Sequence, residues 1–364
     1  DHRADAGGWL TETFNWRAVF LVNLPVGALA IVALWIFMPA SEIRTRRFDF
    51  FGFGLLAIAI GALQLLLDRG QGQDWFSSPE IVAYLGITIA GLWVFVVHSL
   101  TAEHTFIDLR MFKDRNFTMG CAFMFLIGIT VFSGLALLPP MLQSLMGYPV
   151  IQAGIIMAPR GVGTMLSMIL VGRLVARIDA RLLVGTGILI SAFSLFQMTQ
   201  FDATMGEGPI VVSGIIQGLG LGLVFVPLQT LTFATIAPHF RTDATAAFSL
   251  VRNVGQGVGI SLVTAVLTQM VSINHAELAA RVTPFATGTR AVPQLMNGDP
   301  TIVTLINGLV SQQAAMIAYL DDFKLMMWVT LAAVPIVFFL KAAKPRVVAG
   351  PGAGRERAVH AISE

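Results

Sequence analysis

The stretch "AVFLVNLPVGALAIVALWIFM", Ala18–Met38, decides the fold class of this chain. Its 21 residues include no charged side chain, although Asn23 and Pro25 lie inside it. A helix of about 20 apolar residues crosses roughly 30 Å of hydrocarbon. In a membrane helix, neighbouring helices and polar side chains satisfy the carbonyl that Pro25 frees, and Asn23 gains a partner across a helix interface. The stretch therefore predicts a transmembrane helix.

The composition of the whole chain indicates the same environment. Of 364 residues, 55% are hydrophobic and 12% are charged, whereas a typical soluble domain has about 25% charged residues. The mean hydropathy is +0.76. Cys121 is the only cysteine, which excludes an intramolecular disulfide and a cysteine-based metal site. No basic stretch alternates with aromatic residues, so we predict no nucleic-acid binding.

Long apolar windows elsewhere predict further membrane helices. Together with Ala18–Met38 they make nine. The others are Phe51–Leu67, Ile81–His98, Phe117–Leu142, Ile151–Val175, Leu182–Gln200, Ile210–Ile236, Phe248–Val271 and Leu325–Leu340. The predicted fold class is an all-α integral membrane protein with about nine transmembrane helices.

Lysine and arginine are unevenly divided between the two sides that nine crossings define. Four lie on the poorer side, namely Arg69, Arg281, Arg290 and Lys324. Fifteen lie on the richer side: Arg44, Arg46, Arg47, Arg110, Lys113, Arg115, Arg173, Arg177, Arg181, Arg241, Lys341, Lys344, Arg346, Arg355 and Arg357. Because basic residues are enriched in cytoplasmic loops, the bias predicts a cytoplasmic C-terminus.

Several stretches resemble one transporter family. "GGWLTETFNWRAVFLVNLPVG" (7–27) is similar to the end of the fifth and the whole sixth helix of EmrB/QacA-type drug:proton antiporters, the fourteen-helix branch of the major facilitator superfamily. The resemblance covers Gly7 to Lys344. Four other stretches agree with it: "RNFTMGCAFMF" (115–125), "APRGVGTMLSMILVGRLVARIDARLL" (158–183), "GLGLGLVFVPLQTLTF" (218–233) and "FSLVRNVGQGVGIS" (248–261).

The resemblance implies how the chain is divided. Residues 1–38 would be a remnant of the N-terminal half that ends with its last helix, and residues 39–116 two linker helices with cytoplasmic loops. Residues 117–341 would form the C-terminal six-helix bundle, with a long external segment at 272–324. Residues 342–364 would be a cytoplasmic tail. The nine spans then correspond to helices six to fourteen of a partial major facilitator fold.

The function implied by the resemblance is proton-coupled efflux of amphipathic small-molecule drugs across a bacterial inner (plasma) membrane, without a cofactor. The coupling site would lie in the first five helices of the family, outside this chain. No Asp or Glu lies in any of the nine predicted spans, and we therefore expect that this chain does not transport by itself. The alternative is a non-transporting membrane interaction subunit, or a half-transporter that needs a separate N-terminal partner.

An enzyme or a metal site is not predicted. The histidines lie in loops or at span ends, and none pairs with another at the spacing of metal ligands. They are His2, His98, His104, His239, His275 and His360. Membrane lipid is the expected surrounding of the helices.

Arg160 is the ionisable residue deepest in a predicted span, about ten residues into Ile151–Val175. Such residues are costly in hydrocarbon and mark transport pathways or ion pairs. Both interpretations stay open for Arg160. Gln217 and Gln229 are the polar candidates for a transport pathway in Ile210–Ile236.

The same span has Gly214, Gly218 and Gly222 at four-residue spacing. Small residues at this spacing let helix backbones approach closely, which predicts a tight helix–helix contact.

A polar stripe is predicted on the eighth span, where four side chains at i, i+3, i+4 and i+7 share one helix face. These transport-pathway candidates are Ser249, Arg252, Asn253 and Gln256. A cavity lining or inner gate is one interpretation. The other is hydrogen bonding between helices, with Arg252 reaching to the membrane surface.

An adaptable apolar pocket for drugs is a further hypothesis, since methionine and aromatic side chains suit promiscuous binding. Its candidates are Met124, Phe125, Phe132 and Phe225. The alternative for each is an ordinary core or lipid-facing position.

"GRLVARIDAR" (172–181) resembles a worn copy of the superfamily's cytoplasmic-loop motif, G-x-L-x-D-R-x-G-R-R. The matching residues are Gly172, Leu174, Arg177 and Arg181. Ala176 replaces the Asp of the motif and Asp179 replaces its later Gly. A conformational lock is one interpretation of the motif, and arginines that only set the topology are the other.

The external segment 272–324 contains an amphipathic stretch at 301–323. We expect it to lie on the membrane surface or to cap the cavity. Because Gram-negative relatives of this pump type use an external adaptor protein, the segment is also the candidate for docking a periplasmic adaptor.

Overall fold

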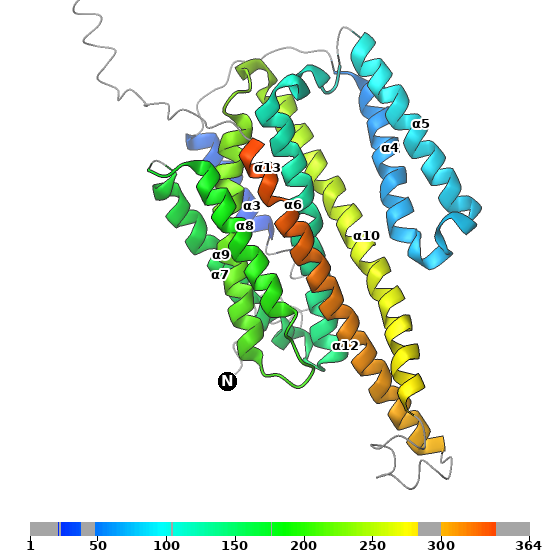
Figure 1. Cartoon of the computed structure of the whole chain (residues 1–364). Coiled ribbons are helices and arrows are strands. Elements are labelled where there is room, and N and C mark those ends of the chain that lie inside the picture. The colour runs from blue at the N-terminus through cyan, green and yellow to red at the C-terminus, as the bar shows by residue number, and fades with distance from the viewer. Residues whose placement is uncertain are drawn as a thin grey trace, which may run out of the picture.

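The computed structural model describes residues 21, 23–37, 48–102, 105–175, 177–282 and 300–339, and these are almost entirely helical (Figure 1). The α-helices are α3 (Asn23–Phe37), α4 (Phe50–Arg69), α5 (Pro79–Thr101), α6 (Arg115–Pro140), α7 (Val150–Leu174), α8 (Ala180–Met198), α9 (Glu207–Phe233), α10 (Arg241–Arg281), α12 (Pro300–Ala332) and α13 (Val334–Phe339).

Eight helical stretches in these residues are long and apolar enough to cross a membrane. The π-helical turn Met141–Leu145 extends α6, and α13 continues α12, within two of these stretches. The remaining expected span is Ala18–Met38, and its described helix is α3, with 15 residues. The predicted all-α membrane fold is confirmed, although the first residues of Ala18–Met38 lie outside the described part of the chain.

The helices from α6 onward form one bundle (Figure 1). Within it α9 packs between α7 and α8, α6 packs along α10, and α12 packs against both α10 and α8. Neighbours in space are therefore often not neighbours in sequence. This arrangement brings side chains from four or more helices into one interior.

Glycines allow the closest of these helix contacts. A Cβ atom at Gly218 would collide with the backbone carbonyl of Arg160 on α7, and one at Gly128 would lie 2.7 Å from the carbonyl oxygen of Arg252 on α10. Gly255 meets α6 in the same way, at the backbone of Phe125. The tight packing predicted from glycine spacing is thus confirmed for α9.

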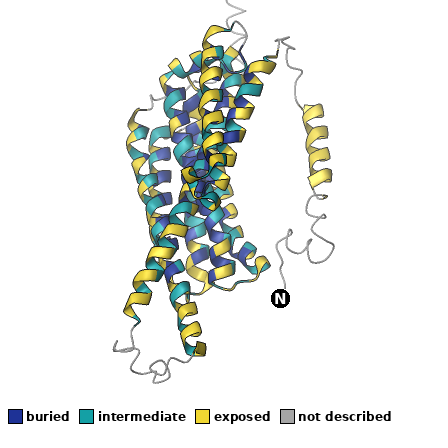
Figure 2. Cartoon of the chain, turned by 90° about the vertical axis from the view of Figure 1, so that its right-hand side faces the viewer, coloured by how far each residue is buried: buried dark blue, intermediate teal, exposed yellow. Residues whose placement is uncertain are grey.

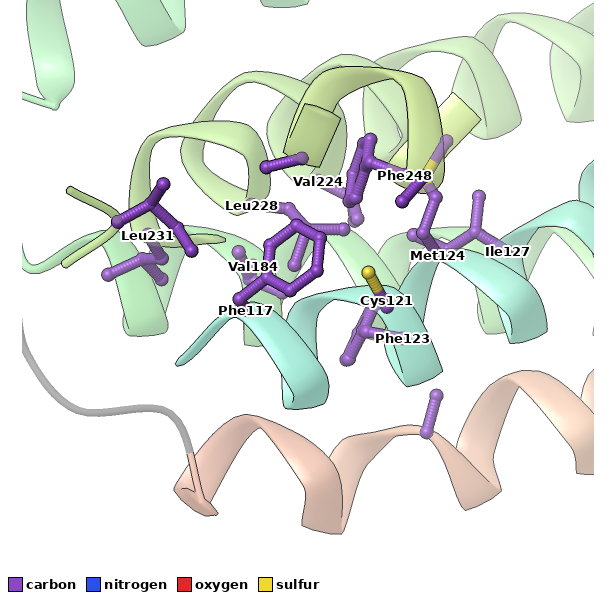
Figure 3. Packing of buried hydrophobic residues seen from close by; sticks show 14 of the residues in the cluster. Phe117, Cys121, Phe123, Met124, Ile127, Val184, Val224, Leu228, Leu231 and Phe248 are labelled. Atoms are coloured by element: carbon purple, nitrogen blue, oxygen red, sulfur yellow. The ribbon is translucent and has the colours of Figure 1, made fainter. Parts of the chain in front are cut away.

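The interior near the start of α6 is filled with apolar side chains. Phe117, Phe123 and Met124 are fully buried and face residues of α8, α9 and α10 (Figure 3). The labelled residues of this cluster are Phe117, Cys121, Phe123, Met124, Ile127, Val184, Val224, Leu228, Leu231 and Phe248. A second cluster at the other end of the bundle surrounds Phe323 and Met141.

The linker pair α4 and α5 packs side by side next to α10 (Figure 1). The Ser261 hydroxyl on α10 donates a hydrogen bond of 2.8 Å to the carbonyl of Leu67 at the end of α4. Helix α3 stands apart from the bundle, and all of its residues are exposed (Figure 2). The linker pair therefore packs against the bundle, whereas α3 does not.

The segment 272–324 is arranged differently from the expectation of a surface helix. Helix α10 runs without interruption to Arg281, and α12 begins at Pro300, so both membrane helices continue into this segment. At 1.5 Å per residue, the 41 residues of α10 span about 60 Å, twice the thickness of hydrocarbon. The ring of His275 lies 3.0 Å from the side-chain oxygen of Asn307, which joins the two extensions.

Candidate functional site

Arg160 lies inside the bundle, on the face of α7 that packs against α9. The residue is 7% exposed, and neither terminal nitrogen of its guanidinium has a hydrogen-bond partner among the described residues. Gly214 and Gly218 of α9 lie next to its Cβ and its backbone carbonyl. The pairing interpretation therefore finds no partner in the described part of the chain, and the buried charge is left without a counter-charge there.

Gln217 lines a small cavity of about 30 Å³ between α6, α8, α9 and α12. Thr130, Ser191 and Thr330 line it as well, and we call this space the polar cavity. The Gln217 side-chain oxygen and the Ser191 hydroxyl are buried without partners among the described residues. A buried water needs roughly 10–15 Å³ and two or more polar partners, so the polar cavity can hold water.

Sequence reasoning missed three of the four polar residues here. Serine and threonine hydroxyls often bond to the carbonyl one turn earlier in their own helix, as Thr330 does to Met326 at 2.7 Å. Nothing in the sequence separates such residues from those that face a cavity. The signal that was available is that Ser191, Gln217 and Thr330 all interrupt apolar helices.

A larger cavity of about 340 Å³ lies between α4 and α10. We call it the linker cavity. Its polar residues are Ser249 and Asn253, and its other lining residues are Phe53, Leu56, Ala57, Ile60, Phe106, Ile107, Ala246 and Leu250. The predicted polar stripe is thereby divided, because Ser249 and Asn253 line the linker cavity.

The other polar candidates lie elsewhere. Arg252 and Gln256 are half-buried, and their backbones meet α6 at Gly128. Gln229 is exposed near the end of α9. None of these three residues lines the polar cavity or the linker cavity.

The apolar pocket candidates belong to the packed interior. Met124 is fully buried, and Phe132 and Phe225 pack against the same core cluster. Phe125 packs against Gly255 of α10. None of the four lines either cavity, so the structure does not gather them around one space.

The loop motif residues lie in the last turn of α7, in the connection that follows it and in the first turn of α8. Gly172 and Arg177 are exposed, and Leu174 ends α7. Asp179, which replaces the glycine of the motif, accepts a 3.0 Å hydrogen bond from the backbone N–H of Arg181 and caps the start of α8. In the described part of the chain neither Arg177 nor Arg181 forms an ion pair.

Asp49 holds together the end of the linker pair. Its carboxylate accepts hydrogen bonds from the backbone N–H groups of Gly52 at 2.8 Å and Phe106 at 3.0 Å, and lies 3.0 Å from the His98 ring. Burial alone would raise the pKa of Asp49. The bonds from Gly52, His98 and Phe106 outweigh that effect and lower the pKa below its usual value.

Asp322 corrects the expectation that no acidic residue lies in a membrane span. Because of the charged residues around Asp322, the predicted span began only at Leu325, but α12 is a continuous helix that includes Asp322. Its side chain is completely buried, and neither carboxylate oxygen has a partner among the described residues. The bundle thus contains a buried acid that hydropathy alone had placed outside the membrane.

Comparison with known proteins agrees with this architecture. The profile of the Major Facilitator Superfamily matches residues 6–260. The multidrug export protein EmrB of Escherichia coli K12 is 30% identical over 355 residues, which are 96% of this chain and 69% of EmrB. The fatty acid resistance protein FarB of Neisseria gonorrhoeae is 33% identical over 354 residues, 95% of this chain and 69% of FarB.

Among solved structures, a bacterial homologue of the human lysosomal transporter Spinster, in an inward-facing and occupied conformation, gives a TM-score of 0.46 at 17% identity, covering 79% of this chain and 64% of that one. The profile match and the two sequence relatives cover most of the chain, including the linker pair and most of the bundle. The chain therefore belongs to the Major Facilitator Superfamily, as an EmrB-type transporter.

Proposed function

We propose that this protein exports amphipathic small molecules across a bacterial inner membrane in exchange for protons, and that residues 1–364 supply its C-terminal bundle, its linker pair and one further helix. The observation that carries the proposal is the match to EmrB and FarB over almost the whole chain. One relative is named for multidrug export and the other for fatty acid resistance, and both kinds of compound include amphipathic molecules.

The linker cavity supports an amphipathic substrate. Its volume of about 340 Å³ falls in the range of small-molecule sites. An apolar group of the substrate would contact Leu56 and Ile60, and a polar group would reach Ser249 and Asn253. Such a site offers few directional hydrogen bonds, which suits a transporter of chemically varied compounds.

Arg160 and Gln217 are proposed to line the transport path when the bundle opens. Both are buried and have polar atoms without partners among the described residues, Arg160 where α7 packs against α9 and Gln217 at the polar cavity. An arginine cannot lose its charge, so it requires water or an anion once the helices separate. Arg252, Gln256, Gln229 and the loop motif residues would act nearer the cytoplasmic surface.

We further propose that the C-terminus is cytoplasmic and that the extensions of α10 and α12 face the opposite side. These extensions expose apolar side chains, among them Ile273, Val303, Leu305 and Leu309. A periplasmic adaptor protein is the partner proposed for them. In this arrangement the adaptor would contact helices that continue directly into the bundle.

Alternating access requires two halves that rock around a central site. The helices of residues 1–364 include one six-helix half, so we propose that export needs additional N-terminal helices and that residues 1–364 alone do not transport. The second candidate function is a half-transporter that associates with a separate N-terminal subunit. Both versions require that this bundle forms one wall of the path.

The test is dye accumulation in bacteria that lack their own drug pumps. Cells that produce the natural gene product should accumulate less of a fluorescent amphipathic dye than cells without it, and cells that produce residues 1–364 alone should not. Ala57→Phe fills the linker cavity and should weaken export, whereas Ala90→Phe, on the exposed face of α5, should not. Equal accumulation with and without the natural product would refute export.

A further inference from the structure

Asp322 is a buried ionisable group that lines neither of the cavities described above. Its exposure is 0%, and its neighbours one turn away on α12, Ala318 and Met326, are buried as well. An ionised carboxylate without hydrogen-bond donors is strongly disfavoured in apolar surroundings, whereas the neutral acid is much less so. The geometry therefore favours an acid that carries its proton.

Asp322 lies in the stretch Pro300–Phe339, which is long and apolar enough to cross a membrane. The side-chain amide of Gln312 donates a 3.1 Å hydrogen bond to the carbonyl of Leu145, at the end of the α6 helical run. Asp322 follows Gln312 by ten residues, or about 15 Å of helix, and precedes Phe339 by about 25 Å. It is thus far from both ends of this long helix.

Among the described residues, no Lys, Arg or His forms an ion pair with the carboxylate. On its own helix, Asp321 and Tyr319 are close, while Lys324 is exposed two residues on, which is the opposite face. Asp202 is exposed beside Phe201, whose ring contacts Phe323 at a centroid distance of 6.2 Å.

The elements packed around α12 carry the other ionisable side chains that could pair with Asp322. They are Arg115 and Cys121 of α6, Tyr148 after it, Arg181 of α8, and Arg241, Asp243, Arg252, His275, Glu277 and Arg281 of α10. Asp322 forms an ion pair with none of them. Because the described residues provide no counter-charge, Asp322 is neutralised by a bound proton.

The polar cavity lies along the same face of α12, about 12 Å of helix from Asp322. Thr330 lines this cavity and follows Asp322 by eight residues, so both share a helix face. Leu195 and Met326 belong to the same apolar cluster as Phe323, the residue after Asp322, and Leu195 also lines the polar cavity. Movement of these two side chains would bring cavity water to the acid.

We propose that Asp322 is a proton-binding site of the C-terminal bundle. In the packed arrangement the carboxyl group holds its proton. When α12 separates from α8 and water enters, the O–H bond breaks, the proton passes to a water molecule, and the carboxylate that remains is hydrated. Repacking of the two helices requires that a proton is taken up again. The link to export rests on the proposed function, whereas the protonation itself does not.

Infrared spectroscopy of the purified chain in lipid nanodiscs at neutral pH tests the protonation. We expect an absorption band of a protonated carboxyl group that shifts in heavy water, is lost in Asp322→Asn and is kept in Asp321→Asn. Asp321 is the matched control, because it is the adjacent acid on the same helix and is less buried. A spectrum that Asp322→Asn leaves unchanged, in a variant with wild-type helicity, would overturn the proposal.

The coupling is tested with the natural gene product in liposomes. We expect Asp322→Asn to let dye move down its own gradient but to lose at least tenfold of the accumulation driven by a pH gradient, with Asp321→Asn like wild type. Gradient-driven accumulation that is unchanged in Asp322→Asn would overturn the coupling role. If the wild type itself moves no dye, the proposed function fails, and the infrared result alone decides whether Asp322 binds a proton.

Discussion

The linker pair and the six-helix bundle differ in where buried polar atoms are left without a partner. At one end of the linker pair, Asp49 is paired with His98. At the other end, Glu80 is bonded to Arg69, Gln73 and Tyr84. In the bundle, Arg160, Ser191, Gln217 and Asp322 have buried polar atoms without partners among the described residues. The Ser99 hydroxyl is the one linker atom of that kind in the described chain.

The difference indicates a division of work. Satisfied polar groups stabilise a helix pair with little interior: 28% of the most apolar part of α4 and 17% of that of α5 are buried, against 61% for α6 with its π-helical turn. Unsatisfied groups cost stability, and a folded protein retains them where they serve a function. We infer that the bundle interior serves transport and that the linker ends serve structure.

The largest expected effect on stability is at Gly218, where α9 packs closely against α7. Gly218→Leu forces a side chain against the backbone of α7, and we expect a loss of about 3 kcal/mol or more in the free energy of unfolding. Gly161→Leu is the matched control, since nothing lies within 4 Å of its Cβ position. Denaturant unfolding in detergent measures both. Equal losses in the two variants would show that helix propensity, and not the close contact with α7, dominates.

The second prediction concerns the cost of an unpaired charge. Arg160→Met removes the guanidinium and keeps an apolar stem, so we expect the free energy of unfolding to rise by roughly 1–3 kcal/mol. The same unfolding experiment measures this gain, with the exposed Arg177→Met as control. A loss of stability in Arg160→Met would mean that the guanidinium has a partner in the folded protein.

The third prediction addresses the linker. Asp49→Ala removes the cap of α4 and leaves the Phe106 N–H without its acceptor, and we expect a loss of about 1–2 kcal/mol. Hydrogen exchange should increase in the first turn of α4 and near Phe106, while α7 and α9 stay protected. Asp68→Ala, an exposed acid of the same helix, should change neither region. Increased exchange throughout the bundle would contradict a local role.

The pH dependence of the linker has a defined sign. Because the pKa of Asp49 is lower in the folded protein than its unfolded value of about 3.9, the stabilisation is complete above that value and is lost as the pH falls through the folded pKa. Thermal unfolding between pH 6 and 3 should show this loss. Asp49→Asn should reduce it, and an identical acid profile in that variant would assign the loss to other carboxyl groups.

The smallest effect is expected at the outer end of the linker. Arg69 and Glu80 form a 2.6 Å ion pair, but both side chains are substantially exposed. Exposed pairs contribute little because water and salt screen them. Arg69→Gln should leave the unfolding temperature unchanged within error at physiological salt. A clear decrease in the unfolding temperature would show that this ion pair stabilises the linker, as Asp49 is expected to do.

The membrane helices and their tight contacts could be predicted because each depends on local patterns. Uncharged runs of about 20 residues located α4 to α9, and the spacing of Gly214, Gly218 and Gly222 predicted a close contact of α9. Hydropathy failed at Asp322, because a window that averages over neighbours cannot tell a buried acid from one in a loop. The linker cavity and polar cavity could not be predicted, since both are assembled from helices that are distant in sequence.

The most direct test of the division of work is the rate of dye export per folded molecule in Arg160→Met and Asp49→Ala of the natural gene product, reconstituted in liposomes with a pH gradient. We predict that Arg160→Met is more stable than wild type and loses most export, whereas Asp49→Ala is less stable and keeps the wild-type rate per folded molecule. Export that survives in Arg160→Met and is lost in Asp49→Ala would contradict the account.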